Sequence, residues 1–230
     1  MKLKITWQYS LAFLSLLFLL HEAHEIIHTS IGRIICGCWG IRDFNLWALC
    51  TGCASDNPIS IFSTIAGPFF TYIVLWYGTK LLIKEDLDKK TLGFTLIFAS
   101  MPFARILTAT LNSGDEVNAL TKLTNQPILS WVISLIIILL ICYIPLKKAY
   151  EFINNKYKLL WFLSFLVLPV IFDILVVLVI MNGLLKNGIL NEYWILGSPK
   201  LVSFWTLSIL ILTILTYKYI NQLTNQNTKK

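Results

Sequence analysis

The chain has 230 residues, of which 57% are hydrophobic and 13% charged, and its mean hydropathy is +0.71. A soluble domain is typically about a quarter charged, and a chain of this length cannot bury so much apolar side chain in its own core. The composition excludes soluble enzyme folds and predicts an all-α, polytopic membrane protein with about six transmembrane helices. The net charge of +7 comes with no nucleic-acid-binding motif, so we expect no nucleic-acid partner and interpret the charge as a signal of membrane topology.

Apolar runs long enough to cross a bilayer, which takes about 20 helical residues, recur along the chain. They lack a regular alternation of apolar and polar residues, so they predict helices rather than strands. No repeat or second domain is visible, and we expect one transmembrane domain over residues 1–220 and a polar tail over residues 221–230. The expected spans are residues 5–30, 59–83, 91–111, 128–146, 159–184 and 201–220.

The basic residues of the connecting segments indicate an orientation. The first apolar run lacks a convincing cleavage site, so we expect it to be retained as the first span. The N-terminus, the segments 80–90 and 147–158 and the C-terminal segment together carry 13 Lys and Arg, against 6 on the alternate side. Because basic residues favour the cytoplasmic side of a membrane, we predict a multi-pass protein with both termini in the cytoplasm.

All three histidines of the chain lie in the last part of the first predicted span, at positions 21, 24 and 28. At about 100° per helical residue, His21, His24, Glu25 and His28 project from one helix face about 100° wide. Histidine and glutamate are costly at membrane depth, so they are functional by default there and need partners. The alternative is that these side chains only satisfy one another as a buried polar network.

Residues 24–28 form the pattern His-Glu-x-x-His. Two imidazoles one turn apart can chelate one Zn²⁺, and the intervening glutamate is then held beside the position where water binds. Zinc lowers the pKa of water toward about 7, and the glutamate can act as the general base. The pattern therefore predicts His24 and His28 as metal ligands and Glu25 as the catalytic residue of a zinc hydrolase.

A catalytic zinc site takes three protein ligands, and the third is expected to be a carboxylate on the same side of the membrane. His24 lies about 29 Å along a helix from Ile5, a depth that Asp115 reaches after the third span. We therefore favour Asp115 and keep Asp173, Glu116 and His21 as alternative ligands.

Two further side chains are expected near the site. Arg105, in the third span, and Asn112, just after it, are candidates to stabilise an oxyanion or to position a substrate. Arg105 is also the expected partner of Asp173, since a lone carboxylate in hydrocarbon needs one.

The segment between the first two spans contains four cysteines as Cys-x-Cys and Cys-x-x-Cys, namely Cys36, Cys38, Cys50 and Cys53. Outside the cytoplasm two disulfides are the expected state. A second, structural zinc site and free thiols are the alternatives. In the second span, the Ala-Gly-Pro sequence at residues 66–68 indicates either a bend that lines a substrate cleft or an ordinary kink.

Taken together, His-Glu-x-x-His at residues 24–28, Ala-Gly-Pro at residues 66–68 and an acidic residue after the third span resemble the site-2 protease family of membrane-embedded zinc metalloproteases. The resemblance covers residues 18–125 as a catalytic core. It implies an intramembrane endopeptidase that cleaves a transmembrane or membrane-proximal peptide segment, with one catalytic Zn²⁺ held by His24, His28 and Asp115 and with Glu25 as base. Its partners would be the lipid bilayer and a membrane protein or peptide substrate.

Two other functions are compatible with the same residues. A metal- or haem-binding membrane transporter or sensor would use the histidines without proteolysis. An inactive, site-2-protease-like protein would keep the fold for binding alone. The sequence does not indicate an oligomeric state.

Overall fold

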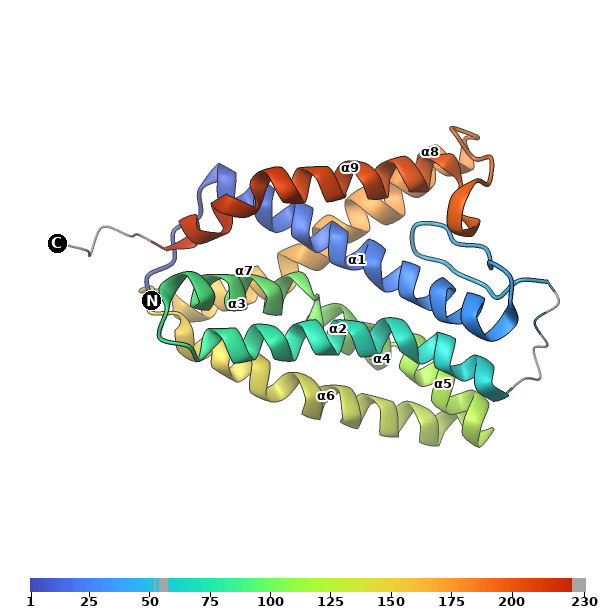
Figure 1. Cartoon of the computed structure of the whole chain (residues 1–230). Helices are drawn as coiled ribbons and strands as arrows, with labels where there is room; N and C mark the ends of the chain where they lie inside the picture. Colours follow the sequence, from blue (N-terminus) through green and yellow to red (C-terminus); the bar gives the residue numbers. More distant parts are fainter. Residues whose placement is uncertain (52, 54–57, 225–230) are drawn as a thin grey trace.

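The computed structural model describes residues 1–51, 53 and 58–224, and within these ranges the chain is an all-α bundle without strands (Figure 1). The last six residues of the expected polar tail, 225–230, lie outside the described residues. The helices in chain order are α1 (Trp7–Cys36), η1 (Pro58–Ser60), α2 (Ile61–Leu82), α3 (Leu87–Ala99), α4 (Pro102–Thr110), α5 (Asp115–Thr124), α6 (Pro127–Phe152), α7 (Lys158–Asp173), η2 (Ile174–Met181), α8 (Asn182–Lys186), η3 (Ile195–Gly197), α9 (Lys200–Thr216) and η4 (Tyr217–Leu223).

Six of the helical segments are long and apolar enough to cross a membrane, as the sequence predicted, so the chain is a multi-pass membrane protein. They alternate in direction, and both described chain ends lie at the same end of the bundle (Figure 1). Their lipid-facing sides carry exposed large apolar side chains, for example Ile128, Ile136 and Leu140 on α6. The segments are Trp7–Cys36, Ile61–Leu82, Leu87–Thr110, Pro127–Phe152, Lys158–Lys186 and Lys200–Leu223.

Helix α1 is longer than the 26 residues expected from hydropathy, because both of its ends are capped. The Thr6 side chain accepts a hydrogen bond from the Tyr9 amide, and Gly37, in the left-handed conformation, donates its amide to the Arg33 carbonyl. The helix has 30 residues, about 45 Å, so His24 lies near its middle and not near its outer end.

The third span is broken, where the sequence predicted one continuous helix over residues 91–111. Pro102 lacks an amide hydrogen and starts α4, and Met101 before it has a positive φ of 50°. The break separates α3 from α4 and changes the direction of the chain. Arg105, on α4, thereby reaches the polar side of α1.

The end of the bundle that holds the chain termini is packed with aromatic side chains. Phe165 on α7 makes edge or tilted contacts with Tyr9, Phe13, Phe94 and Phe98 from α1 and α3. The Tyr9 hydroxyl also hydrogen bonds with the hydroxyl of Thr95. This apolar packing holds α1, α3 and α7 together, and the histidines and glutamates of α1 lie in its other half.

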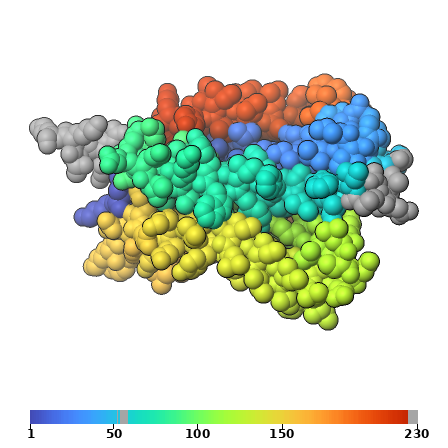
Figure 2. All heavy atoms as spheres, turned by 60° about the horizontal axis from the view of Figure 1, so that its bottom comes forward, coloured from blue at the N-terminus to red at the C-terminus, as the bar shows by residue number. Residues whose placement is uncertain are grey.

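At that opposite end, the 37–50 loop packs against the connection between α8 and α9 (Figure 2). Arg42, only 2% exposed, forms an ion pair with Glu22 on α1 at 2.7 Å and donates its Nε hydrogen to Ser198. Thr206 on α9 donates to the same Glu22 oxygen at 2.6 Å. One buried charge pair thus joins α1, the loop and α9.

The four loop cysteines form two disulfides, Cys36–Cys53 and Cys38–Cys50. Disulfides were the state that the sequence analysis favoured for these cysteines. Because all four are bonded to one another, they are not available as ligands of a second, structural zinc ion. The fifth cysteine, Cys142, is buried and free on α6.

The disulfides predict the result of thiol counting. Protein unfolded without reductant should take up one alkyl group per chain, at Cys142, and reduced protein should take up five. Mass spectrometry of both samples measures this, and peptide mapping identifies the pairs. Labelling of Cys36 or Cys50 before reduction would contradict the pairing.

The Arg42–Glu22 pair predicts a stability effect. Arg42→Met should lower the unfolding free energy by about 3–5 kcal/mol, because it leaves a carboxylate buried without a counter-charge. Glu22→Leu/Arg42→Met, which removes both charges, should recover most of this loss. Thermal unfolding in detergent, followed by circular dichroism, measures both variants, and equal losses in the two would contradict the prediction.

Candidate metal centre

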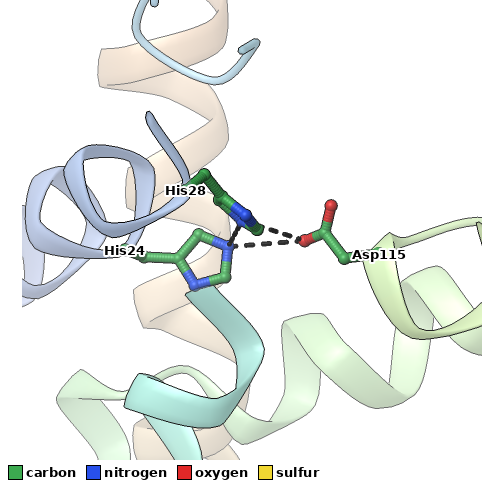
Figure 3. A group of neighbouring side chains, drawn as sticks. All are labelled: His24, His28 and Asp115. Carbon is green, nitrogen blue, oxygen red and sulfur yellow. Dashed lines mark hydrogen bonds and ion pairs between the residues drawn. The ribbon is translucent and has the colours of Figure 1, made fainter. Parts of the chain in front are cut away.

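Three side chains from two distant segments converge beside the middle of α1 (Figure 3). His24 and His28 lie one turn apart on α1, and Asp115 is the first residue of α5. Gly114, with a φ of 99°, lets the chain turn sharply after α4, so that α5 begins with Asp115 directed at the histidines. The structure therefore places Asp115, the favoured third ligand, with the histidine pair.

The distances between the three candidate ligand atoms suit a small metal ion. The two histidine Nε2 atoms are 3.0 Å apart, and Asp115 Oδ2 lies 3.4 Å from His24 Nε2 and 3.5 Å from His28 Nε2. Four ligands at zinc–nitrogen and zinc–oxygen distances of about 2.0–2.1 Å in a tetrahedron are separated by about 3.3 Å. The triangle has the dimensions of one face of such a tetrahedron.

The Nε2 atoms of both histidines face the candidate centre. His28 Nδ1 lies 2.6 Å from the Ser63 carbonyl oxygen, which can only accept, so Nδ1 carries a hydrogen and Nε2 is the nitrogen that could bind a metal. Arg105 donates from Nη2 to His24 Nε2 at 2.9 Å. Two imidazole nitrogens and a carboxylate oxygen therefore meet, and a bound cation would replace Arg105 as the partner of His24 Nε2.

Helix α2 closes over the histidines through the Ala-Gly-Pro sequence. A Cβ atom at Gly67 would lie 2.2 Å from His28 Nε2 and 2.7 Å from His24 Cε1. Only a glycine lets the α2 backbone approach this closely. Helix α2 is continuous through residues 66–68, and Gly67 packs directly against the histidines.

On its other side, the His28 ring stacks on Trp47 of the disulfide-linked loop, with ring centres 4.6 Å apart and planes 10° apart. His28 has no exposed surface and His24 only 3%. The imidazoles are thus held between α2 and the loop, and their orientation is set before any ligand arrives.

Glu25, the candidate base, is 7% exposed. Its Oε2 atom is buried and accepts no hydrogen bond in the described structure. An unpaired buried carboxylate oxygen is costly, and Glu22 Oε1 on the same helix is in the same state. Glu25 lines both cavities at the site, described below.

Among the lysines and arginines of the described residues, only Arg105 forms ion pairs with Asp115 and Glu116. Its Nη1 lies 3.3 Å from Asp115 Oδ2 and 3.9 Å from Glu116 Oε2. With Glu25 ionised, three carboxylates are set against one guanidinium, so a divalent cation would make the cluster neutral. Burial alone would raise the pKa of Asp115, but the adjacent histidines and Arg105 hold that pKa well below its usual range.

Two cavities meet at the cluster. The larger, about 1060 Å³, is lined by the 45–50 loop, α2, α4 and α5, and it extends to the exposed residues Asn118 and Lys122. The smaller, about 120 Å³, lies deeper, between α1, α4 and Asp173. His24, Glu25 and Arg105 line both, so the cluster is reachable from one end of the bundle.

The remaining sequence candidates lie outside the three-residue group. Glu116 accepts a hydrogen bond from the Tyr72 hydroxyl at 2.6 Å. His21 and Asp173 pair with each other at 2.7 Å. Asn112 is exposed in the turn after α4 and does not line either cavity.

The expected pairing of Arg105 with Asp173 is wrong, because the break at Met101 directs α4 toward α5 and Asp173 finds His21 instead. Sequence reasoning also missed Ser63 and Trp47. Ser63 acts through its backbone carbonyl, which no side-chain pattern reveals, and the contact of Trp47 with His28 depends on how the 37–50 loop folds back on α1.

No family model, curated protein or solved structure matches this chain. The interpretation of the centre therefore depends on its own geometry.

Gly67→Ala tests the close approach of α2. The added methyl group should displace the histidine rings and reduce zinc binding at least tenfold, an effect comparable to losing a residue that orients a ligand. Zinc titration of purified protein, monitored by elemental analysis, measures the change. Gly183→Ala is the matched control, since nothing lies within 4 Å of a Cβ at that position. Equal zinc affinity in the two variants would contradict the packing argument.

Proposed function

We propose that this chain is an intramembrane zinc metalloendopeptidase. The observation that supports this most is the convergence of His24 Nε2, His28 Nε2 and Asp115 Oδ2 beside Glu25, whose Oε2 is buried and unpaired. A structural zinc site has no use for such a base. The resemblance to site-2 proteases, drawn from the motifs alone, agrees with this choice.

Zinc bound there would supply Lewis acidity, which polarises a peptide carbonyl and lets water ionise near neutral pH. Glu25 would then take a proton on Oε2 and return it to the amine that leaves when the peptide bond breaks. Its burial strengthens its electrostatic interactions with the reacting groups.

Arg105 would act on the substrate oxygen. Its guanidinium is held by Asp115 and Glu116 and lines both cavities, so it can donate to an oxygen on which negative charge develops. Because two carboxylates anchor it, the donor is oriented before the reaction begins.

The substrate would be an unfolded or extended peptide segment close to the membrane. The large cavity runs from the cluster to exposed residues of α5, so a chain leaving the bilayer at this end has a path to Glu25. If the termini are cytoplasmic, as the basic residues predict, this end faces away from the cytoplasm, where disulfides such as those of the adjacent loop are stable.

The proposal predicts separate effects of ligand and base substitutions. Purified wild type should contain one zinc per chain, and Asp115→Ala should lose most of it. Glu25→Gln should keep the zinc and cleave labelled casein, an unfolded protein, about 10²- to 10⁴-fold more slowly. Elemental analysis and a fluorescence assay in detergent measure the two quantities.

Glu151→Gln is the matched control, because Glu151 is an exposed carboxylate paired with Lys148 at the other end of the bundle. It should change neither quantity. Zinc-free wild type would end the proposal, and full cleavage by Glu25→Gln would exclude Glu25 as the base. Zinc exchange without cleavage would favour the transporter or sensor.

A further inference from the structure

A groove lies between α4, α6 and α7, and none of the candidate metal ligands lines it. Its volume is about 340 Å³, and its wall is mostly apolar or aromatic, with Ile106 from α4, Leu139 and Leu146 from α6 and Phe162 from α7. All of these residues belong to segments that are apolar and long enough to cross the membrane. The groove therefore opens into the hydrocarbon core, where a lipid chain and not water fills it.

The groove has the length of one acyl chain. The α6 residues that line it recur every three or four positions from Leu139 to Tyr150, so they share one face of the helix. At a rise of about 1.5 Å per residue, this face is about 16 Å long. Because the hydrocarbon core of a bilayer is about 30 Å thick, the groove spans the depth of one leaflet.

Basic side chains lie at the end of the groove that is nearer the chain termini. The Nζ atom of Lys147 lies 6.0 Å from the centre of the Tyr143 ring, and Nζ of Lys158 lies 4.3 Å from the centre of the Tyr150 ring. Both tyrosine rings line the groove. Lysine and tyrosine keep their apolar parts in hydrocarbon and their polar tips at the membrane surface, so this end of the groove lies at the depth of the lipid headgroups.

The two ammonium groups have no carboxylate partner. Glu151, near the end of α6, forms its ion pair with Lys148 at 2.9 Å. Within the described residues, neither Lys147 nor Lys158 forms an ion pair. A negatively charged headgroup at this end of the groove would therefore meet two positive charges that the protein itself leaves unneutralised.

We infer that this groove binds one anionic phospholipid, with an acyl chain along α6 and the phosphate group beside Lys147 and Lys158. The apolar wall accommodates the chain, and the lysines select a lipid with a net negative charge. A zwitterionic lipid is disfavoured, because it brings its own ammonium group to the same two lysines. The site is separate from the candidate metal centre and does not depend on the function proposed for that centre.

The test compares two lipids that differ only in the headgroup. Purified protein in detergent is titrated with phosphatidylglycerol or with phosphatidylcholine of the same acyl chains, and native mass spectrometry measures the lipid that stays bound. Wild type should bind one phosphatidylglycerol at least tenfold more tightly than phosphatidylcholine. Lys147→Gln/Lys158→Gln should lose this preference, since each lysine near a membrane surface contributes to the attraction of an anionic lipid.

Lys80→Gln/Lys84→Gln is the matched control. It removes two exposed lysines near the end of α2, at the same end of the bundle (Figure 1) but outside the groove. The control should keep the wild-type preference for phosphatidylglycerol. An equal loss of preference in the two double variants would show that net charge alone attracts the lipid, and it would overturn the inference.

A phosphatidylglycerol with a photoreactive diazirine in its acyl chain tests the location. After irradiation, peptide mapping should find the lipid attached to α6 between Leu139 and Leu146, to Ile106 or to Phe162, which surround the groove. Attachment mainly to α2 or α9 would place the lipid elsewhere and overturn the inference. Equal affinity of wild type for the two lipids would do the same.

Discussion

The structure depends on one constraint, which is that polar side chains in the middle of an apolar bundle must find partners. The second half of α1 carries Glu22, His24 and His28 in an environment where unpaired polar groups are costly. Each has a partner in a different part of the chain. Glu22 pairs with Arg42 of the 37–50 loop, His24 with Asp115 of α5, and His28 with the Ser63 carbonyl of α2. The polar face of α1 therefore organises the segments around it.

The two ends of the bundle are held together by different kinds of interaction. At the end with the chain termini, aromatic side chains from α1, α3 and α7 pack together without charged groups among them. At the other end, ion pairs and two disulfides hold the connecting segments over the cluster. Apolar packing thus sets the helix positions, and directional polar contacts set the side-chain orientations on which a metal site depends.

Glu25 is the carboxylate of α1 that has no charged partner within hydrogen-bonding distance. One of its carboxylate oxygens is buried without a hydrogen bond, and the other lies near His21 at a distance longer than a hydrogen bond. The Glu25 carboxylate therefore has protein contacts on one side and a free oxygen on the other, as a general base requires. Glu22, three residues earlier on the same helix, also has one buried oxygen without a hydrogen bond, but its other oxygen forms an ion pair with Arg42 at 2.7 Å.

Local properties of the sequence were enough to predict the spans and the candidate His24, Glu25 and His28 on one helix face. Length and hydropathy act over about 20 consecutive residues, and helical spacing acts over one or two turns, so both can be read without the fold. The favoured state of the loop cysteines was also predicted, though their pairing was not.

Only the tertiary structure decided which carboxylate joins the histidines and which pairs elsewhere. Asp115, Glu116 and Asp173 were all candidates, and the choice among them depends on the break at Met101 and on the register of α7 against α1. The approach of Gly67 to the histidines likewise depends on two helices meeting. Partners far apart in sequence are selected by the packing of whole helices, and no short-range pattern records that packing.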